Sequence, residues 1–404
     1  MHIMTQCQFN RLEAIVAEIV PNLLEAPTDE PIGLMSGRAG HALAVWYARH
    51  FNSDLVDENQ FSEMLSELQG AVPYVSKDHR FSRGLPGVAW LFELLLWEQD
   101  DPYLAEFNQN VDRILLNLLQ VESWQGEIEL MEGLSGLAPY AARRLKQANQ
   151  TAVYKEIIRH FSDLAVWIFP DQCTWPNPPN SPYNMKSQPE EPEHNLGLAH
   201  GVPAVLAALI APTQHKDLSS VAKPLLQGGA NWLAAQRQDS DELECHYGYL
   251  AGEPSHSRLG WCYGDASNAL ILARAGAVLN DKALIQAART VALHAASRSP
   301  EAGLVRDGGL CHGSAGLSLI FSLLHTLLGD PELQNAAEFW LEDTIKRYEN
   351  HGLNGFDAYR YEPENGKPYF VADTGFLAGY AGVALALMAA TEQSPDWGDC
   401  LLLL

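Results

Sequence analysis

Two cysteines and two histidines occupy matching places in three short segments of the chain. When the segments are aligned on the glycine that ends each one, His200 and His312 precede it by one residue. Cys262 and Cys311 precede it by two residues. Matching positions of neighbouring structural repeats lie close together in space, so we expect these four side chains at one end of the molecule. The segments are Ala199-His200-Gly201, Trp261-Cys262-Tyr263-Gly264 and Leu310-Cys311-His312-Gly313.

The residue types in these segments suit a zinc ion. Thiolate and imidazole groups are preferred zinc ligands, and three protein ligands with an open fourth position are typical of a catalytic centre. We therefore predict that Cys262, Cys311 and His312 bind Zn²⁺, with Gly313 allowing the sharp turn that two adjacent ligands need. The same Cys-His dipeptide recurs at 245–246 without a turn glycine directly after it, and we assign that pair a structural role.

The three segments belong to a longer series of glycine turns. Most of the turns precede an apolar run that has apolar residues on nearly every side of a helix, as in helices buried all round. Amphipathic segments at 104–120, 154–168, 281–297 and 331–350 lie between these runs. The shared glycines are Gly37, Gly84, Gly133, Gly201, Gly264, Gly313 and Gly379, and the apolar runs span 40–47, 88–97, 202–210, 266–278, 317–328 and 383–390.

This alternation predicts an all-α fold, a double-layered α/α toroid of seven inner and seven outer helices forming one domain over residues 1–404. All seven turns would then lie on one rim. Longer separations between some turns predict insertions at that rim near 169–195, 238–258 and 354–373, and the last contains a β-hairpin around Asn365-Gly366. Together the insertions would shape a groove large enough for a peptide.

Composition limits the partners and the compartment. The chain carries 26 basic and 50 acidic residues, a formal net charge of −24, which would repel nucleic acid and anionic membrane surfaces. No apolar stretch is long enough to cross a bilayer, and the first residues do not resemble a signal peptide. Six cysteines in 404 residues do not form a disulfide framework, so we expect a reducing cytoplasm.

The motifs AHG at 199–201, WCYG at 261–264 and CHG at 311–313, with EGLSG at 132–136, resemble the lanthionine synthetase C (LanC-like) family over essentially the whole chain. The resemblance implies a toroid with zinc at its mouth. It also implies a cyclase that adds cysteine thiols to dehydroalanine or dehydrobutyrine in a precursor peptide, forming lanthionine or methyllanthionine rings. The implied ligands are Cys262, Cys311 and His312, the implied acid/base residue is His200, and Arg258 matches the family's arginine.

The chain departs from the family pattern at Glu129, where bacterial members typically carry an aspartate. Its carboxylate would hold the His200 tautomer, or it would only cap the helix entered at Gly133. In the mechanism that the resemblance implies, a zinc-activated thiol attacks the dehydro residue and His200 protonates the resulting enolate. Arg258 would orient the rim or stabilise the enolate oxygen.

The resemblance also implies partners: a dehydrated precursor peptide with leader and core, a dehydratase and a transporter. A complex of these proteins would hold the chain at the inner face of the membrane. Three other functions remain open at this point. They are an enzyme that adds glutathione to dehydroamino acids, a zinc-stabilised peptide-binding scaffold without turnover, and another α/α toroid such as a glycosidase or terpenoid cyclase.

Overall fold

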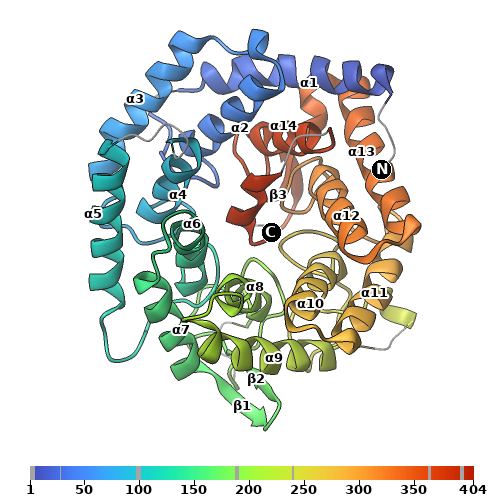
Figure 1. The fold of residues 1–404 in the computed structure, drawn as a ribbon. Coiled ribbons are helices and arrows are strands. Elements are labelled where there is room, and N and C mark those ends of the chain that lie inside the picture. Colours follow the sequence, from blue (N-terminus) through green and yellow to red (C-terminus); the bar gives the residue numbers. More distant parts are fainter. Residues whose placement is uncertain are drawn as a thin grey trace.

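The helices of the protein form two concentric rings in a computed structural model, which describes residues 5–27, 29–96, 102–186, 191–238, 241–362, 365–391 and 395–404 (Figure 1). Within these ranges fourteen α-helices alternate between the rings, which confirms the predicted all-α toroid. The inner helices are α2 (Arg38–Phe51), α4 (Leu85–Leu96), α6 (Ala138–Ala148), α8 (Val202–Thr213), α10 (Asp265–Leu279), α12 (Ser314–Leu328) and α14 (Tyr380–Ala389). The outer helices are α1 (Gln6–Leu24), α3 (Glu58–Val75), α5 (Pro102–Leu119), α7 (Ala152–Leu164), α9 (Ser219–Ala235), α11 (Lys282–Ser297) and α13 (Pro331–His351).

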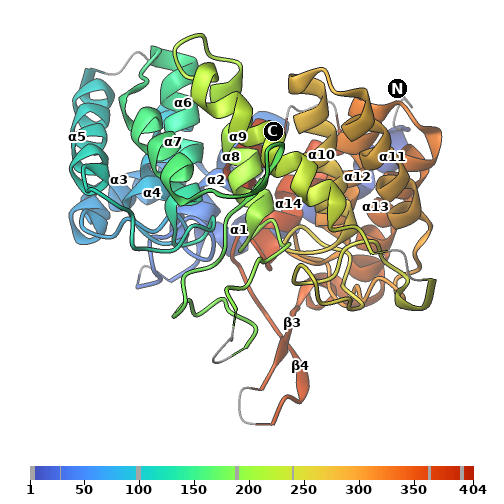
Figure 2. The same cartoon turned by 90° about the horizontal axis from the view of Figure 1, so that it is seen from below.

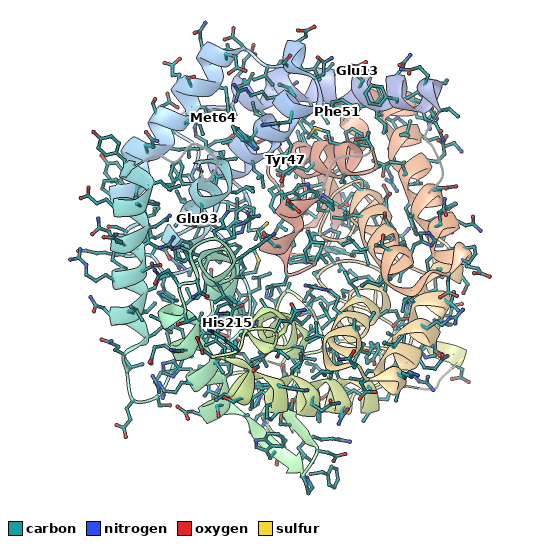
Figure 3. All side chains as sticks on the ribbon, viewed as in Figure 1. Glu13, Tyr47, Phe51, Met64, Glu93 and His215 are labelled. Atoms are coloured by element: carbon teal, nitrogen blue, oxygen red, sulfur yellow. The ribbon has the colours of Figure 1, made fainter. Side chains whose placement is uncertain are left out.

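The two rings differ in how their side chains are buried. Along α8 every residue from Val202 to Ile210 is buried, as expected for a helix with neighbours on all sides. Outer helix α7 buries one stripe, which includes Tyr154, Ile157 and Phe161, and leaves its polar face in water. Buried side chains such as those of Met64 in α3 and Glu93 in α4 occupy the space between the two rings (Figure 3). The apolar pattern of the sequence therefore sorts the helices into layers.

Each inner helix starts after a turn glycine that closely approaches backbone earlier in its turn. In six of the seven turns that backbone lies six residues before the glycine, and at Gly313 it is Gly309 N. A Cβ atom on Gly201 would lie 2.0 Å from the carbonyl oxygen of Asn195, so no larger residue fits there. Gly264 has a similar clash, 1.9 Å from the oxygen of Arg258, and its φ of 98° is also in the left-handed region. Close approach is therefore the main reason for glycine at these turns.

Backbone hydrogen bonds join the seven turns into a closed circuit. Every turn donates to the next one around the ring, so segments far apart in sequence lie side by side on one rim. The turns that carry the candidate ligands are three consecutive members of this circuit. The bonds are Met35 N to Ser82 O (3.0 Å), Ser82 N to Met131 O (2.9 Å), Leu130 N to Ala199 O (3.2 Å), Ala199 N to Cys262 O (3.3 Å), Cys262 N to Cys311 O (3.2 Å), Cys311 N to Leu377 O (2.8 Å) and Leu377 N to Met35 O (3.1 Å).

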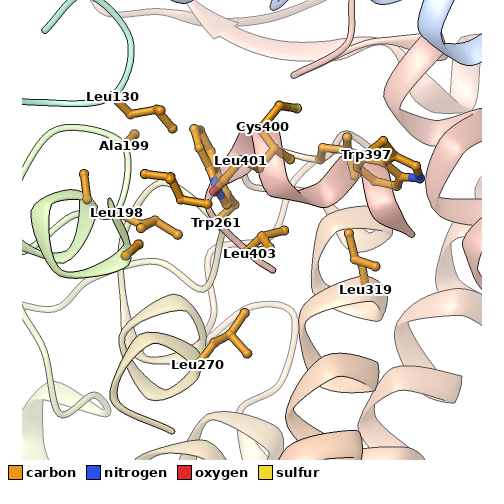
Figure 4. Close-up of a cluster of buried hydrophobic side chains, with 14 of the residues drawn as sticks. Leu130, Leu198, Ala199, Trp261, Leu270, Leu319, Trp397, Cys400, Leu401 and Leu403 are labelled. Atoms are coloured by element: carbon orange, nitrogen blue, oxygen red, sulfur yellow. The ribbon is translucent and has the colours of Figure 1, made fainter. Parts of the chain in front are cut away.

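The segment 395–404 fills the centre of the ring (Figure 1). It contains the short helix η6 (Asp396–Leu401), and its buried Cys400 and Leu401 lie beside Trp261 (Figure 4). The Trp261 indole donates a hydrogen bond of 2.9 Å to the Leu401 carbonyl. Because Trp261 directly precedes Cys262, this packing fixes the backbone next to a candidate ligand.

Two short hairpins and four further 3₁₀ helices complete the described elements. Strand β3 (Ala358–Tyr361) pairs antiparallel with β4 (Pro368–Val371), which confirms the predicted hairpin. Residues 363 and 364 of its turn, like Trp97 at the end of one predicted apolar run, lie outside the described residues. The hairpin extends away from the helical rings (Figure 2). The 3₁₀ helices are η1 (Ser53–Leu55), η3 (Leu134–Leu137), η4 (Asp241–Leu243) and η5 (Gly352–Phe356).

The prediction of a helix continuing to Ile168 is wrong. Helix α7 ends at Leu164, and β1 (Val166–Phe169) pairs antiparallel with β2 (Gln172–Thr174) outside the ring (Figure 1). The run Val-Trp-Ile-Phe is rich in β-branched and aromatic residues, which favour a strand, and proline follows it. Among the described residues no helix is both long and apolar enough to cross a membrane.

One buried histidine makes the stability of the fold sensitive to acid. Burial, with a further contribution from the nearby Arg38, lowers the pKa of His41 in α2 to about 4. The folded protein holds His41 neutral, whereas the unfolded chain takes up a proton below its ordinary pKa of 6.5. The stability that this difference contributes is present above pH 6.5 and is lost as the pH falls toward 4.

We expect the free energy of unfolding to fall by about 2 kcal/mol between roughly pH 7 and pH 5 because of His41. Urea titrations of the wild type and of His41→Leu at both pH values measure the contribution of His41 to the free energy of unfolding. The variant should lose less stability on acidification. His351→Leu, at an exposed site at the end of α13, is the matched control. Equal acid losses in the wild type and His41→Leu would contradict the assignment.

Candidate metal centre

The three predicted metal ligands meet at the rim. Cys262 lies in the turn before α10, and Cys311 and His312 lie in the turn before α12. Their potential ligand atoms all lie within 4.8 Å of one another, the one such group of three found in the described ranges. Cys262 is 7% exposed, and the other two residues are half-buried. The spacing read from the sequence therefore corresponds to proximity in the fold.

A buried carboxylate orients His312. The Nε2 atom of His312 lies 3.2 Å from Oδ2 of Asp307, and Asp307 is 1% exposed. The other imidazole nitrogen, Nδ1, is buried and makes no hydrogen bond of ordinary geometry within the described residues, although the His312 side chain interacts with the Cys262 thiol. Because buried polar atoms usually have a partner, a nitrogen in this state beside two thiols is what a metal ion would satisfy.

The pKa shifts of these three side chains also suit a metal centre. A hydrogen bond with Cys311 lowers the pKa of the Cys262 thiol well below its ordinary value, and His312 lowers it further against the effect of burial. The same bond raises the pKa of Cys311. Burial would lower the pKa of His312, but its contacts with Asp307 and Cys262 outweigh burial and raise it to about 9. The donor set thus fits zinc, which would replace the shared protons of the group.

Asp307 was not among the residues singled out from the sequence. Its Oδ1 accepts a hydrogen bond from Gly309 N (3.1 Å), and its Oδ2 accepts one from Tyr359 N in β3 (3.0 Å). The carboxylate therefore links the turn, the candidate ligand His312 and the base of the β3–β4 hairpin. A signal was present in the sequence, because Asp307 precedes its turn glycine by six residues, as Arg258 does in the preceding repeat.

A second imidazole–carboxylate pair lies on the neighbouring turns. His200 Nδ1 is 3.1 Å from Glu129 Oε2, and Glu129 is 1% exposed. The same carboxylate accepts hydrogen bonds from the backbone of Met131 (2.7 Å) and of Glu132. The two roles that the sequence left open for Glu129 are therefore compatible in geometry, since it caps the turn before Gly133 and also contacts His200.

The remaining predicted residue, Arg258, also reaches this rim. Burial would lower the pKa of its guanidinium, but the thiols of Cys262 and Cys311 and the hydroxyl of Tyr249 outweigh burial and raise it. The two groups of side chains are adjacent, because the His200 ring lies 6.2 Å from that of Tyr263, next to Cys262. All six predicted site residues thus come from turns three to six of one rim.

The Cys245–His246 pair has no place in this group. The Cys245 thiol donates to the Ser255 carbonyl (3.3 Å) and accepts from Ser257 N (3.3 Å). His246 N donates to the buried carboxylate of Asp265 (3.0 Å). These contacts hold the 238–258 insertion together, in agreement with the structural role expected for the pair.

The fold and the site define an α/α toroid with a Cys/Cys/His group on one rim that could hold a metal ion. The family model described as "Lanthionine synthetase C-like protein" matches residues 28–402, and the chain belongs to this family. A solved structure named "Nisin cyclase" is similar to the chain with a TM-score of 0.67 and 19% sequence identity. The similarity covers 98% of this chain and 97% of that one, which shows a shared fold.

We predict about one zinc per purified chain, since the three side chains form one centre. Cys311→Ala should lose the metal but stay folded, because the buried core of the rings does not depend on the ligand. Metal analysis of the purified proteins and circular dichroism check the two parts. Full zinc occupancy in the folded variant would mean that the ligand assignment is wrong.

Asp307→Asn should weaken zinc binding by about 10–100-fold. The asparagine keeps an oxygen for Gly309 N but replaces Oδ2, so that position can accept neither from His312 nor from Tyr359 N. Competition with a chelator measures the affinity without any assay of activity. Asp373→Asn is the matched control, because Asp373 makes the same turn contact to Gly375 N (2.8 Å) in the next repeat. Equal affinities in the two variants would contradict a role for Asp307 in orienting His312.

Proposed function

We propose that this protein is a zinc-dependent lanthipeptide cyclase that adds peptide cysteine thiols to dehydroalanine or dehydrobutyrine. One observation carries the proposal: a Cys/Cys/His ligand set and a separate histidine–carboxylate pair lie on adjacent turns of one rim. Family membership and the similarity to a protein named nisin cyclase support the same reaction. The chemistry needs an activated thiol and a proton donor, and the two groups supply them separately.

The first group would activate the thiol. Cys262, Cys311 and His312 would hold zinc, which lowers the pKa of a coordinated thiol so that the nucleophilic thiolate forms near neutral pH. Cys262 and Cys311 contribute negative charge to this centre, so the substrate sulfur would stay electron-rich. Asp307 keeps the His312 ring in one orientation and one tautomer.

The second group, His200 and Glu129, would transfer the proton that the reaction needs. Attack of sulfur on the β-carbon of the dehydro residue leaves an enolate, whose α-carbon then takes up a proton. Glu129 accepts at Nδ1 of His200, which leaves Nε2 as the nitrogen that exchanges a proton with substrate. A net proton passes from the substrate thiol to the α-carbon, so the peptide keeps its mass while a carbon–sulfur bond forms.

Arg258 would act between the two groups. Its guanidinium interacts with both candidate thiol ligands and carries a positive charge under all ordinary conditions. A fixed cation here would stabilise the enolate oxygen that develops during the attack. It would also offset the negative charge of the two cysteine ligands.

The substrate we propose is a peptide in which serine or threonine has already been dehydrated. A dehydratase must therefore act first, and it and a transporter are the partners we propose for this chain. Segments of the three insertions border the rim, where the β3–β4 hairpin projects from the rings (Figure 2). A cysteine-containing peptide would lie across this face with its reacting residues at the centre.

The decisive test is incubation with a dehydrated, cysteine-containing peptide. Loss of free peptide thiol at constant mass would support the cyclase. A gain of the mass of glutathione, seen only when glutathione is present, would favour the alternative in which a free thiol is added. Tight binding with no chemical change would favour a peptide-binding scaffold.

His200→Ala should lower the rate of cyclisation by about 10²–10⁴-fold, because a general acid contributes that much. Zinc content and peptide binding should stay unchanged, since His200 is not in the ligand group. Mass spectrometry after thiol alkylation follows the rate, and metal analysis follows the zinc. Loss of zinc from this variant would mean that His200 is itself a ligand.

A further inference from the structure

The rim insertion before α8 places an aromatic ring flat against the candidate proton donor. The ring of Tyr183 lies parallel to that of His200, with centroids 4.3 Å apart and planes 16° apart. Tyr183 is half-buried, and none of the sequence motifs includes it. A stacked pair at this distance covers one face of the imidazole and excludes water from it.

The loop that carries Tyr183 is firmly anchored on both sides. Tyr183 N donates to the hydroxyl of Ser181 (3.1 Å), and that hydroxyl donates to Glu127 Oε2 (2.7 Å). On the other side, the backbone of Met185 and of Lys186 donates to the carboxylate of Glu193 (2.7 and 2.9 Å). These contacts therefore hold the backbone on both sides of the ring.

The anchors of both rings come from one stretch of turn three. Glu127 holds the loop of Tyr183 through Ser181, and Glu129, two residues further on, holds His200. Burial and the nearby Glu129 raise the pKa of Tyr183, so its phenol stays neutral. The two rings and the two carboxylates therefore belong to one connected group of contacts. This group joins turn three, turn four and the insertion before α8.

The geometry points to Tyr183 as a positioning residue for His200. A hydrogen bond at Nδ1 fixes one edge of the imidazole but leaves the ring free to rock about that contact. A parallel ring on one face fixes its plane. The two contacts together fix the direction of Nε2, and that direction decides which face of the enolate receives the proton. Tyr183 thereby governs the configuration at the new α-carbon.

This inference rests on the proposed cyclase function and predicts a selective defect. Tyr183→Leu removes the flat face at similar bulk and should lower kcat by about 10–100-fold, the effect expected of a misplaced catalytic group. Its KM and zinc content should stay near those of the wild type, and its thioether rings should form as mixed α-carbon diastereomers. Tyr183→Phe keeps the stacked ring and should restore both rate and configuration.

Chiral analysis of the hydrolysed product and steady-state kinetics make the two comparisons. Tyr74→Leu, at an exposed tyrosine of α3, is the matched control for the same substitution. An NMR readout needs no activity, because the ring current of Tyr183 shifts the His200 ring proton signals, and Tyr183→Leu should remove that shift.

The outcomes separate the two proposals. If the wild type does not cyclise the peptide, the proposed function fails whatever Tyr183 does. If the wild type cyclises and Tyr183→Leu matches it in rate and configuration, Tyr183 has no positioning role. If Tyr183→Phe shows the same defect as Tyr183→Leu, the hydroxyl acts rather than the ring, and the stacking argument is overturned.

Discussion

The closed circuit of backbone hydrogen bonds on the rim is the constraint on which the other features depend. Each turn is bonded to a neighbour on both sides, so no single turn can shift without breaking a bond in an adjacent repeat. The turn glycines make this possible, because a side chain at Gly201 would meet the backbone of Asn195. A residue beside a turn glycine is therefore oriented by the whole ring rather than by its own helix.

A buried carboxylate contacts each of the two histidines of the site, in two different surroundings. Asp307 and Glu129 are each 1% exposed, and each is itself held by backbone N–H groups of its own turn. Asp307 contacts Nε2 of His312, whose side chain lies beside the two thiols in an arrangement that suits metal binding. Glu129 contacts Nδ1 of His200, which lies outside the Cys/Cys/His group. One ring thus places two histidines, each in contact with a buried carboxylate, on turns four and six.

The insertions between repeats add what the ring itself does not provide. Each one brings a tyrosine to the site: Tyr183 stacks on His200, Tyr249 contacts Arg258, and Tyr359 donates its backbone N–H to Asp307. The regular turns supply the candidate site residues, whereas the irregular segments between them contact these residues. Substitutions in the insertions should therefore alter precision and selectivity more than the chemistry itself.

The sequence alone was sufficient to predict the two layers of helices and to choose Cys262, Cys311 and His312 as a group. Apolar periodicity reports whether a helix is buried all round, and matching positions in a closed repeat must converge in space. The hairpin around Gly366 was also predictable, because Asn-Gly between two short runs is a strong local signal of a hairpin. These features depend on local pattern and on repetition.

Other features were decided only by the tertiary structure. The charged residues of α7 favour a helix up to Val166, whereas the side chains of Val166–Phe169 favour a strand. Pairing with β2 decides in favour of the strand. The place of 395–404 in the centre of the ring depends on the space that the inner helices leave. The stacking of Tyr183 on His200 joins an irregular insertion to a regular turn, so no spacing rule relates the two residues. Periodicity determines which residues share a face or a rim, and contacts between unlike segments arise only when the whole ring closes.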